Sequence, residues 1–101
     1  MHSEIDAFEL LNRLNKGEKL NLLDVREEIE FNTYNIGGQN IPLKSVGLVA
    51  GGVIPNKSEE IIVICTAGLR SATAATLLAD AGYTNVRNLT GGLLAVQKIK
   101  H

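Results

Sequence analysis

The sequence has one cysteine, no tryptophan, two prolines and only two histidines in 101 residues. A single cysteine cannot form a disulfide within the chain and gives no sign of an oxidising compartment, so we expect a cytoplasmic protein. His2 and His101 lie at the two ends, where chains are least ordered. A cysteine–histidine dyad or a histidine-ligated metal is therefore not expected, and the sequence predicts no metal and no cofactor.

Charge of one sign and long apolar segments are also lacking. Ten basic and 11 acidic residues give a formal net charge of −1, so no basic surface for nucleic acid or an anionic membrane is expected. No segment approaches the roughly 20 apolar residues of a membrane span, and the N-terminal segment lacks the apolar core of a secretory signal. With 45% hydrophobic residues and no linker or repeat, we expect one globular domain over residues 1–101, with a natural start at Met1, acting as a monomer.

What the sequence does contain is an alternation of apolar strands and helices. Residues 6–15 have helical periodicity, with Asp6 as N-cap, Glu9 as its capping-box partner and Gly17 just past the end. Further helices are expected over residues 27–31, 43–50, 71–81 and 92–98, and strands over 20–25, near 41, over 61–65 and over 85–89. This order predicts an α/β fold with a mostly parallel sheet.

The sharpest signal is IIVICTAGLRSATAATLLADAG, residues 61–82, in which a continuous β-branched run ends on Cys65. In open α/β sheets, ligands bind beyond the carboxyl ends of the strands, where helix N-termini present free N–H groups. Residues 66–70 can therefore turn their N–H groups toward the Cys65 sulfur, with Gly68 supplying a positive φ and Ser71 capping the next helix. We expect these groups and the helix dipole to lower the pKa of Cys65.

Arg70, five residues after Cys65, supports an anion site in this loop. A cation near a helix N-terminus costs about 0.3–1 kcal/mol, so stability alone would not select it there, whereas an anion would. The alternative is that Cys65 is a small buried apolar side chain and that Arg70 reaches into solvent. The spacing favours the functional interpretation.

Three segments, in this order, resemble the single-domain rhodaneses, a family of sulfurtransferases. LLDVREEIEF resembles the segment with the Asp-x-Arg pair, NIGGQNIPL resembles the following turn and strand, and residues 61–96 resemble the active-site strand, loop, helix and Gly-Gly segment. The resemblance implies a five-stranded, mostly parallel sheet with helices on both faces, and a persulfide on Cys65. It also implies that Asp24 and Arg26 brace the active-site loop through hydrogen bonds, although an ordinary surface salt bridge is the alternative for that pair.

Three positions depart from the family's pattern. Asn35 stands where histidine is frequent, and the turn before Ile41 is one residue short; we interpret both as structural. Thr66 stands where thiosulfate-using members often have a basic residue, which puts a preference for that donor in question. Val96 stands where many members have tryptophan, so we expect one wall near the site to be reshaped.

The predicted activity is transfer of sulfane sulfur. The Cys65 thiolate takes sulfur from thiosulfate or a protein persulfide, the loop holds the anion, Arg70 orients the donor, and cyanide, a thiol or a sulfur-carrier protein accepts the sulfur. The predicted nucleophile is Cys65. The predicted substrate-binding loop consists of Thr66, Ala67, Gly68, Leu69 and Arg70. The residues predicted to support this loop are Asp24, Arg26 and Ser71.

Two other classes remain as alternatives. A phosphatase or arsenate reductase also uses a cysteine, a loop of amides and an arginine. However, the related phosphatase loops are one residue longer, and there is no second cysteine to resolve an oxidised intermediate. The other alternative is a non-enzymatic or sulfur-relay module of a larger pathway, such as cofactor or tRNA thiolation.

Overall fold

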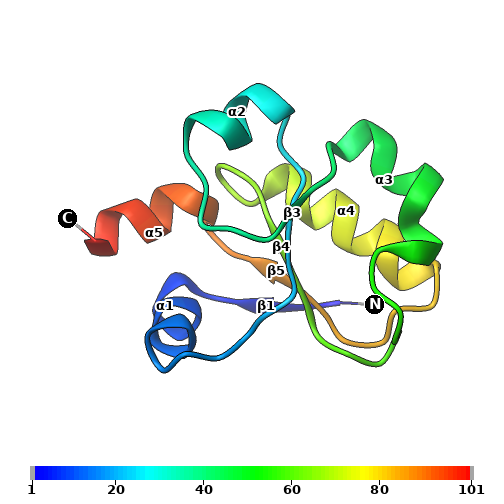
Figure 1. Ribbon diagram of the computed structural model, residues 1–101, viewed down its shortest axis with the longest axis horizontal. Coiled ribbons are helices and arrows are strands. Elements are labelled where there is room, and N and C mark those ends of the chain that lie inside the picture. The colour runs from blue at the N-terminus through cyan, green and yellow to red at the C-terminus, as the bar shows by residue number, and fades with distance from the viewer. Residues whose placement is uncertain (1, 101) are drawn as a thin grey trace.

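The computed structural model describes residues 2–100 and contains a five-stranded sheet with helices on both faces (Figure 1). The strands are β1 (Ser3–Ile5), β2 (Leu22–Asp24), β3 (Gln39–Asn40), β4 (Ile61–Ile64) and β5 (Val86–Leu89). The helices are α1 (Ala7–Asn15), α2 (Glu28–Thr33), α3 (Leu43–Val49), α4 (Leu69–Asp80) and α5 (Gly92–Lys100), and a short 3-10 helix follows α3 at Ala50–Gly52. The predicted α/β fold is confirmed.

The strands lie in the order β1-β5-β4-β2-β3, and every neighbouring pair is parallel. β4 is the central strand, with Val63 opposite Leu23 on one side and opposite Asn88 on the other. Because all strands run the same way, their carboxyl ends share one edge of the sheet. That edge carries the residues that immediately follow β2 and β4.

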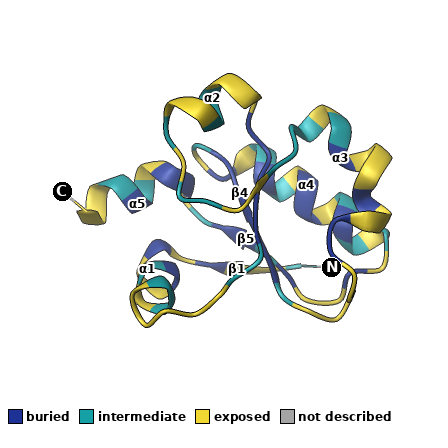
Figure 2. Cartoon of the chain, viewed as in Figure 1, coloured by how far each residue is buried: buried dark blue, intermediate teal, exposed yellow. Residues whose placement is uncertain are grey.

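The β-branched run of β4 is buried on both faces, as its sequence predicts. Successive side chains of a strand point to opposite faces. Ile61 and Val63 pack into a core with α3 and α4, whereas Ile62 and Ile64 pack into a second core with α1 and α5. Figure 2 shows buried residues along the central strands and on the inward sides of the helices.

One predicted helix start and one predicted capping box need correction. α4 begins at Leu69, two residues before the predicted start, because Gly68 takes the N-cap position with φ +97°. Ser71 is therefore not the N-cap; it lies in the first turn of α4, and its side chain is buried. At α1, Asp6 caps as predicted and accepts a hydrogen bond from the Glu9 N–H at 2.8 Å, but the Glu9 side chain bonds to Arg87 and closes no capping box.

The short strand β1 has no counterpart among the predicted elements. It has only three residues, and Ile5 is the only buried one. No helix within residues 2–100 is long and apolar enough to cross a lipid bilayer.

Candidate active site

Cys65 directly follows β4, at the carboxyl edge of the sheet, and is 1% exposed. Its Sγ accepts hydrogen bonds from the N–H of Gly68 at 3.1 Å and from the N–H of Ser71 at 3.3 Å. The Ser71 hydroxyl lies 3.3 Å from the same sulfur. The loop therefore turns its N–H groups toward the sulfur, as the sequence predicts, and the positive φ of Gly68 makes this turn accessible.

The carbonyl groups of Cys65 and Thr66, at the start of the loop, are held by α5. The Leu93 N–H donates to Cys65 O at 3.0 Å, and the Leu94 N–H donates to Thr66 O at 3.1 Å. Gly92, at φ +59°, lets α5 approach this closely: a Cβ at this position would lie 2.5 Å from Cys65 O and would also collide with Thr66 O. The Gly-Gly segment thus fixes which way the peptide groups of the loop point.

The pKa of Cys65 is lowered despite its burial. Burial alone raises the pKa of the thiol, but hydrogen bonds from the Ser71 hydroxyl and from the backbone N–H groups of Ser71, Gly68 and Ala67 outweigh it. The shift has the direction predicted from the sequence. It increases the fraction of Cys65 present as thiolate, the form of cysteine that reacts as a nucleophile.

Asn88 on β5 is a site residue that sequence reasoning missed. The Ser71 hydroxyl has a single proton, which it donates to Asn88 Oδ1 and can turn to the sulfur when Cys65 is ionised, and Asn88 Nδ2 donates to Gly68 O at 3.2 Å. Asn88 is 4% exposed, so it positions both the hydroxyl and the N-cap of α4 from inside the protein. A polar residue within a buried strand was the available signal, because such a side chain requires buried hydrogen-bond partners.

Arg70 forms an ion pair within the protein, which neither of its two sequence-based interpretations, an anion-binding side chain or one extended into solvent, includes. Its Nη1 and Nη2 donate to the two carboxylate oxygens of Glu30 on α2, at 2.7 and 3.0 Å, and Nη2 also donates to Thr66 Oγ1 at 3.2 Å. Arg70 is therefore neither free to receive an anionic donor nor extended into solvent. The hydrogen bonds from Arg70 are the largest cause that lowers the pKa of Glu30 to about 2.

Asp24, the last residue of β2, and Arg26, two residues later, form a buried ion pair. Arg26 donates from Nε to Asp24 Oδ1 at 2.9 Å and from Nη2 to Asp24 Oδ2 at 2.8 Å and to Tyr34 O at 2.6 Å. Asn40 Nδ2 donates to the carbonyl groups of both residues. The alternative that this pair is an ordinary surface salt bridge is therefore wrong. Within residues 2–100, neither side chain hydrogen-bonds to the loop 66–70; the pair instead ties β2 to the 34–40 segment.

The comparison with known proteins places this arrangement in a family. The profile of the rhodanese-like domain family matches residues 6–99. The chain belongs to the rhodanese-like domain family.

Three proteins illustrate how similar the relatives are. The thiosulfate sulfurtransferase PspE of Escherichia coli is 37% identical over 81 residues, which cover 77% of this chain and 77% of that protein. The "Probable adenylyltransferase/sulfurtransferase MoeZ" of Mycobacterium tuberculosis is 33% identical over 97 residues, 95% of this chain but 25% of that protein, so this chain spans a quarter of that relative. The solution structure of a rhodanese-like domain from Anabaena matches with a TM-score of 0.86 at 32% identity, covering 98% of this chain and 76% of that one.

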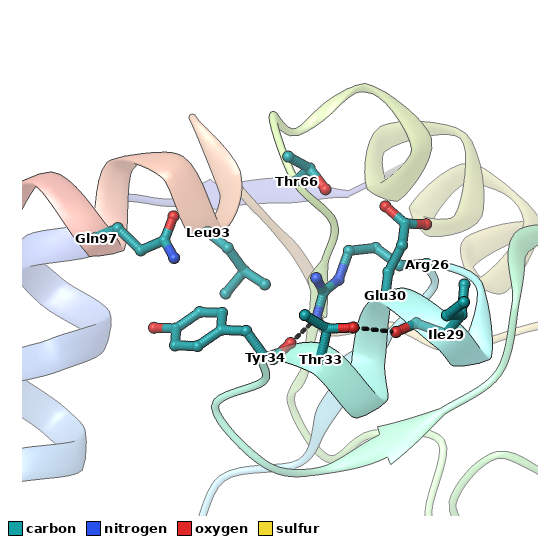
Figure 3. A pocket seen from close by; sticks show the side chains of 8 residues that line it. All are labelled: Arg26, Ile29, Glu30, Thr33, Tyr34, Thr66, Leu93 and Gln97. Atoms are coloured by element: carbon teal, nitrogen blue, oxygen red, sulfur yellow. Dashed lines mark hydrogen bonds between the residues drawn. The ribbon is translucent and has the colours of Figure 1, made fainter.

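This rhodanese-like domain has a cavity of about 320 Å³ beside the loop 66–70. Figure 3 shows its lining, to which α2 and α5 contribute: Arg26, Ile29, Glu30, Thr33, Tyr34, Thr66, Leu93 and Gln97. Thr66 follows Cys65 directly, so the cavity reaches the neighbour of Cys65 in the chain. Val96 does not line it, because its side chain is fully buried in the core with α1.

The Ser71 hydroxyl can be tested through the reactivity of Cys65. We expect Ser71→Ala to raise the pKa of Cys65 and to slow alkylation at neutral pH roughly tenfold, because a hydrogen bond to the charged sulfur is lost. The measurement is the rate of iodoacetamide labelling across pH. Ser58→Ala, at an exposed serine, is the control. An unchanged pH midpoint in Ser71→Ala would show that the hydroxyl does not stabilise the thiolate.

Proposed function

We propose that this rhodanese-like domain is a sulfurtransferase that carries sulfane sulfur as a persulfide on Cys65 and passes it to cyanide, a thiol or a protein acceptor. The observation that carries the proposal is the Cys65 sulfur at the N-terminus of α4, accepting hydrogen bonds from the N–H groups of Gly68 and Ser71. The sulfurtransferase names of the relatives support it.

In the first step, the Cys65 thiolate attacks the outer sulfur of the donor. A Cys65–sulfur bond forms, the donor's own bond to that sulfur breaks, and the leaving group departs with the electron pair, as sulfite from thiosulfate or as a thiolate from a protein persulfide. No general base is needed, because the nucleophile is already ionised. In the second step, the acceptor attacks the outer sulfur, and Cys65 is released as a thiolate.

The loop is suited to hold the persulfide anion between the two steps. The N–H groups of Leu69 and Arg70, in the first turn of α4, have no hydrogen-bond partner among the described residues 2–100. Free N–H groups at a helix N-terminus favour an anion, which here is the terminal sulfur of Cys65–S–S⁻. Preorganised donors of this kind stabilise charge without further reorganisation.

Incubation with thiosulfate followed by intact-mass measurement tests the proposal. We expect the wild-type chain to gain the mass of one sulfur atom and to form thiocyanate with cyanide, and we expect Cys65→Ser to do neither. Because Cys65 is the only cysteine, this variant has no other thiol to load. A second loading with a persulfide donor protein identifies a relay role if thiosulfate fails. If neither donor adds sulfur to the wild type, the proposal is wrong.

We further propose that residues 1–101 act as one domain and as a monomer in the cytoplasm, with a small-molecule sulfur donor or a sulfur-carrier protein as partner. The single cysteine and the near-neutral charge balance support this compartment and class of partner. Elution of the reduced chain as a dimer in size-exclusion chromatography would contradict the monomer.

A further inference from the structure

The charge of Arg70 is already neutralised within the protein. Its guanidinium makes two hydrogen bonds to the Glu30 carboxylate in a parallel arrangement, the strongest geometry for such a pair. Both side chains are only partly exposed, with 38% of Arg70 and 34% of Glu30 accessible. The only cation of the loop therefore presents no net positive charge to a ligand.

The other charged groups around the cavity do not supply a net positive charge either. Arg26 lines the cavity, but Asp24 pairs with it through three hydrogen bonds from the guanidinium to the carboxylate. Glu30 also lines the cavity, and it stays ionised at neutral pH because its pKa lies at about 2. Thr66 adds a hydroxyl without charge. The wall thus holds two neutralised ion pairs, beside a cysteine that is itself negative when reactive.

A small dianion gains little from such a wall. The electrostatic energy of a donor in the site is proportional to the charge of the donor. The Cys65 thiolate therefore repels a dianion twice as strongly as a monoanion. An unpaired Arg70 would offset that repulsion. Glu30 cancels this attraction between Arg70 and the donor, because its carboxylate pairs with the guanidinium.

We propose that Glu30 determines donor specificity: by holding Arg70 in an ion pair, it disfavours small dianionic donors such as thiosulfate relative to donors of lower charge, such as persulfides. This proposal rests on the proposed sulfur transfer. Glu30 acts through Arg70, so it is a positioning residue. The persulfide class fits the site because its reacting end carries at most one charge.

Glu30→Gln is the decisive variant. Glutamine keeps the length of the side chain and can still accept the hydrogen bond that Glu30 Oε1 receives from the Glu27 N–H at the start of α2. It removes the charge and replaces Oε2, which accepts from Arg70 Nη2, with an NH2 group that cannot accept, so the paired arrangement with the guanidinium is lost. We expect KM for thiosulfate to fall about three- to tenfold while kcat changes less than about twofold, because the ground-state encounter and the transition state gain the same attraction.

A second donor makes the test specific for charge. With methanethiosulfonate, a monoanion that also carries sulfane sulfur, we expect KM to fall only about two- to threefold, because the interaction scales with donor charge. In the double variant Glu30→Gln with Arg70→Gln, the fall in KM for thiosulfate is expected to disappear. Glu28→Gln is the matched control, since it removes a carboxylate from an exposed position of the same helix. Its KM is expected to stay at the wild-type value.

The possible failures are distinguishable. If the wild type takes sulfur from neither thiosulfate nor a persulfide donor, the proposed function fails before any variant is measured, and the role of Glu30 fails with it. If the wild type transfers sulfur but Glu30→Gln leaves KM for thiosulfate unchanged or raises it, the role of Glu30 alone is wrong.

The wild type provides an independent measurement if Glu30→Gln folds poorly. A neutralised site predicts a KM for thiosulfate that is constant or falls as salt rises, because salt screens the repulsion by the thiolate. A steep rise of KM with salt would indicate an attractive cationic site and would contradict the proposal.

Discussion

Gly92→Ala is expected to reduce sulfur transfer about a hundredfold and to lower the free energy of unfolding by about 2–5 kcal/mol. The added Cβ would lie 2.5 Å from Cys65 O, and this neighbour is a backbone atom that no side-chain rotation can move. The loop must shift, and with it the N–H groups that hold the sulfur. Alanine is also strained at φ +59°. Denaturant unfolding and the thiocyanate assay measure the two effects.

Two alanine variants separate the causes of that loss. Gly82→Ala also places alanine at a positive φ, +103°, but contacts only the Lys57 side chain, at 3.6 Å, so we expect reduced stability and nearly full activity. Gly47→Ala, in α3 with nothing within 4 Å, is expected to preserve activity and to stabilise the helix by up to about 1 kcal/mol. Full activity in Gly92→Ala would show that close contact with α5 does not hold the loop.

Asp24→Ala is expected to lower the free energy of unfolding by about 3–5 kcal/mol, the cost of leaving a buried charge without its partner. Asp24 is 1% exposed and Arg26 is 5% exposed, so solvent replaces little of what the Arg26 guanidinium would lose. It would keep only the hydrogen bond to Tyr34 O among those it now makes. Urea unfolding monitored by circular dichroism measures the change.

The matched control is an ion pair at the surface. Lys44 and Glu27 approach to 3.6 Å with more than half of each side chain exposed, and Lys44→Ala is expected to cost only about 0–1 kcal/mol. A double variant, Asp24→Leu with Arg26→Met, is expected to be more stable than Asp24→Ala, because no unpaired charge remains. A loss below about 1 kcal/mol in Asp24→Ala would show that water reaches Arg26 freely.

The features that the sequence predicted correctly depend on local patterns. The run IIVIC marks a strand buried on both faces, and the glycine three residues later permits the turn that brings N–H groups to the Cys65 sulfur. The residues that make this contact lie within seven positions of one another. Their arrangement therefore follows from backbone geometry that a short stretch of sequence contains.

The features that were missed depend on contacts between distant segments. Glu30 lies 40 positions from Arg70, and nothing in either segment indicates that the two would meet. The start of α4 was misplaced for a similar reason: serine is a common N-cap, but Asn88 on β5 draws the Ser71 hydroxyl inward. Gly68 can then cap the helix without a side chain.

The parallel pairing of β1 with β5 also bears on how the chain folds. Ser3 pairs with Arg87 and Ile5 with Leu89, so one edge strand finds its neighbour only after almost the whole domain has been synthesised. Pairing across such a separation is slow, and an unpaired strand edge can associate with other chains in the meantime. β1 is short and exposes Ser3 and Glu4. Both features limit the association of β1 with other chains before β5 has been synthesised.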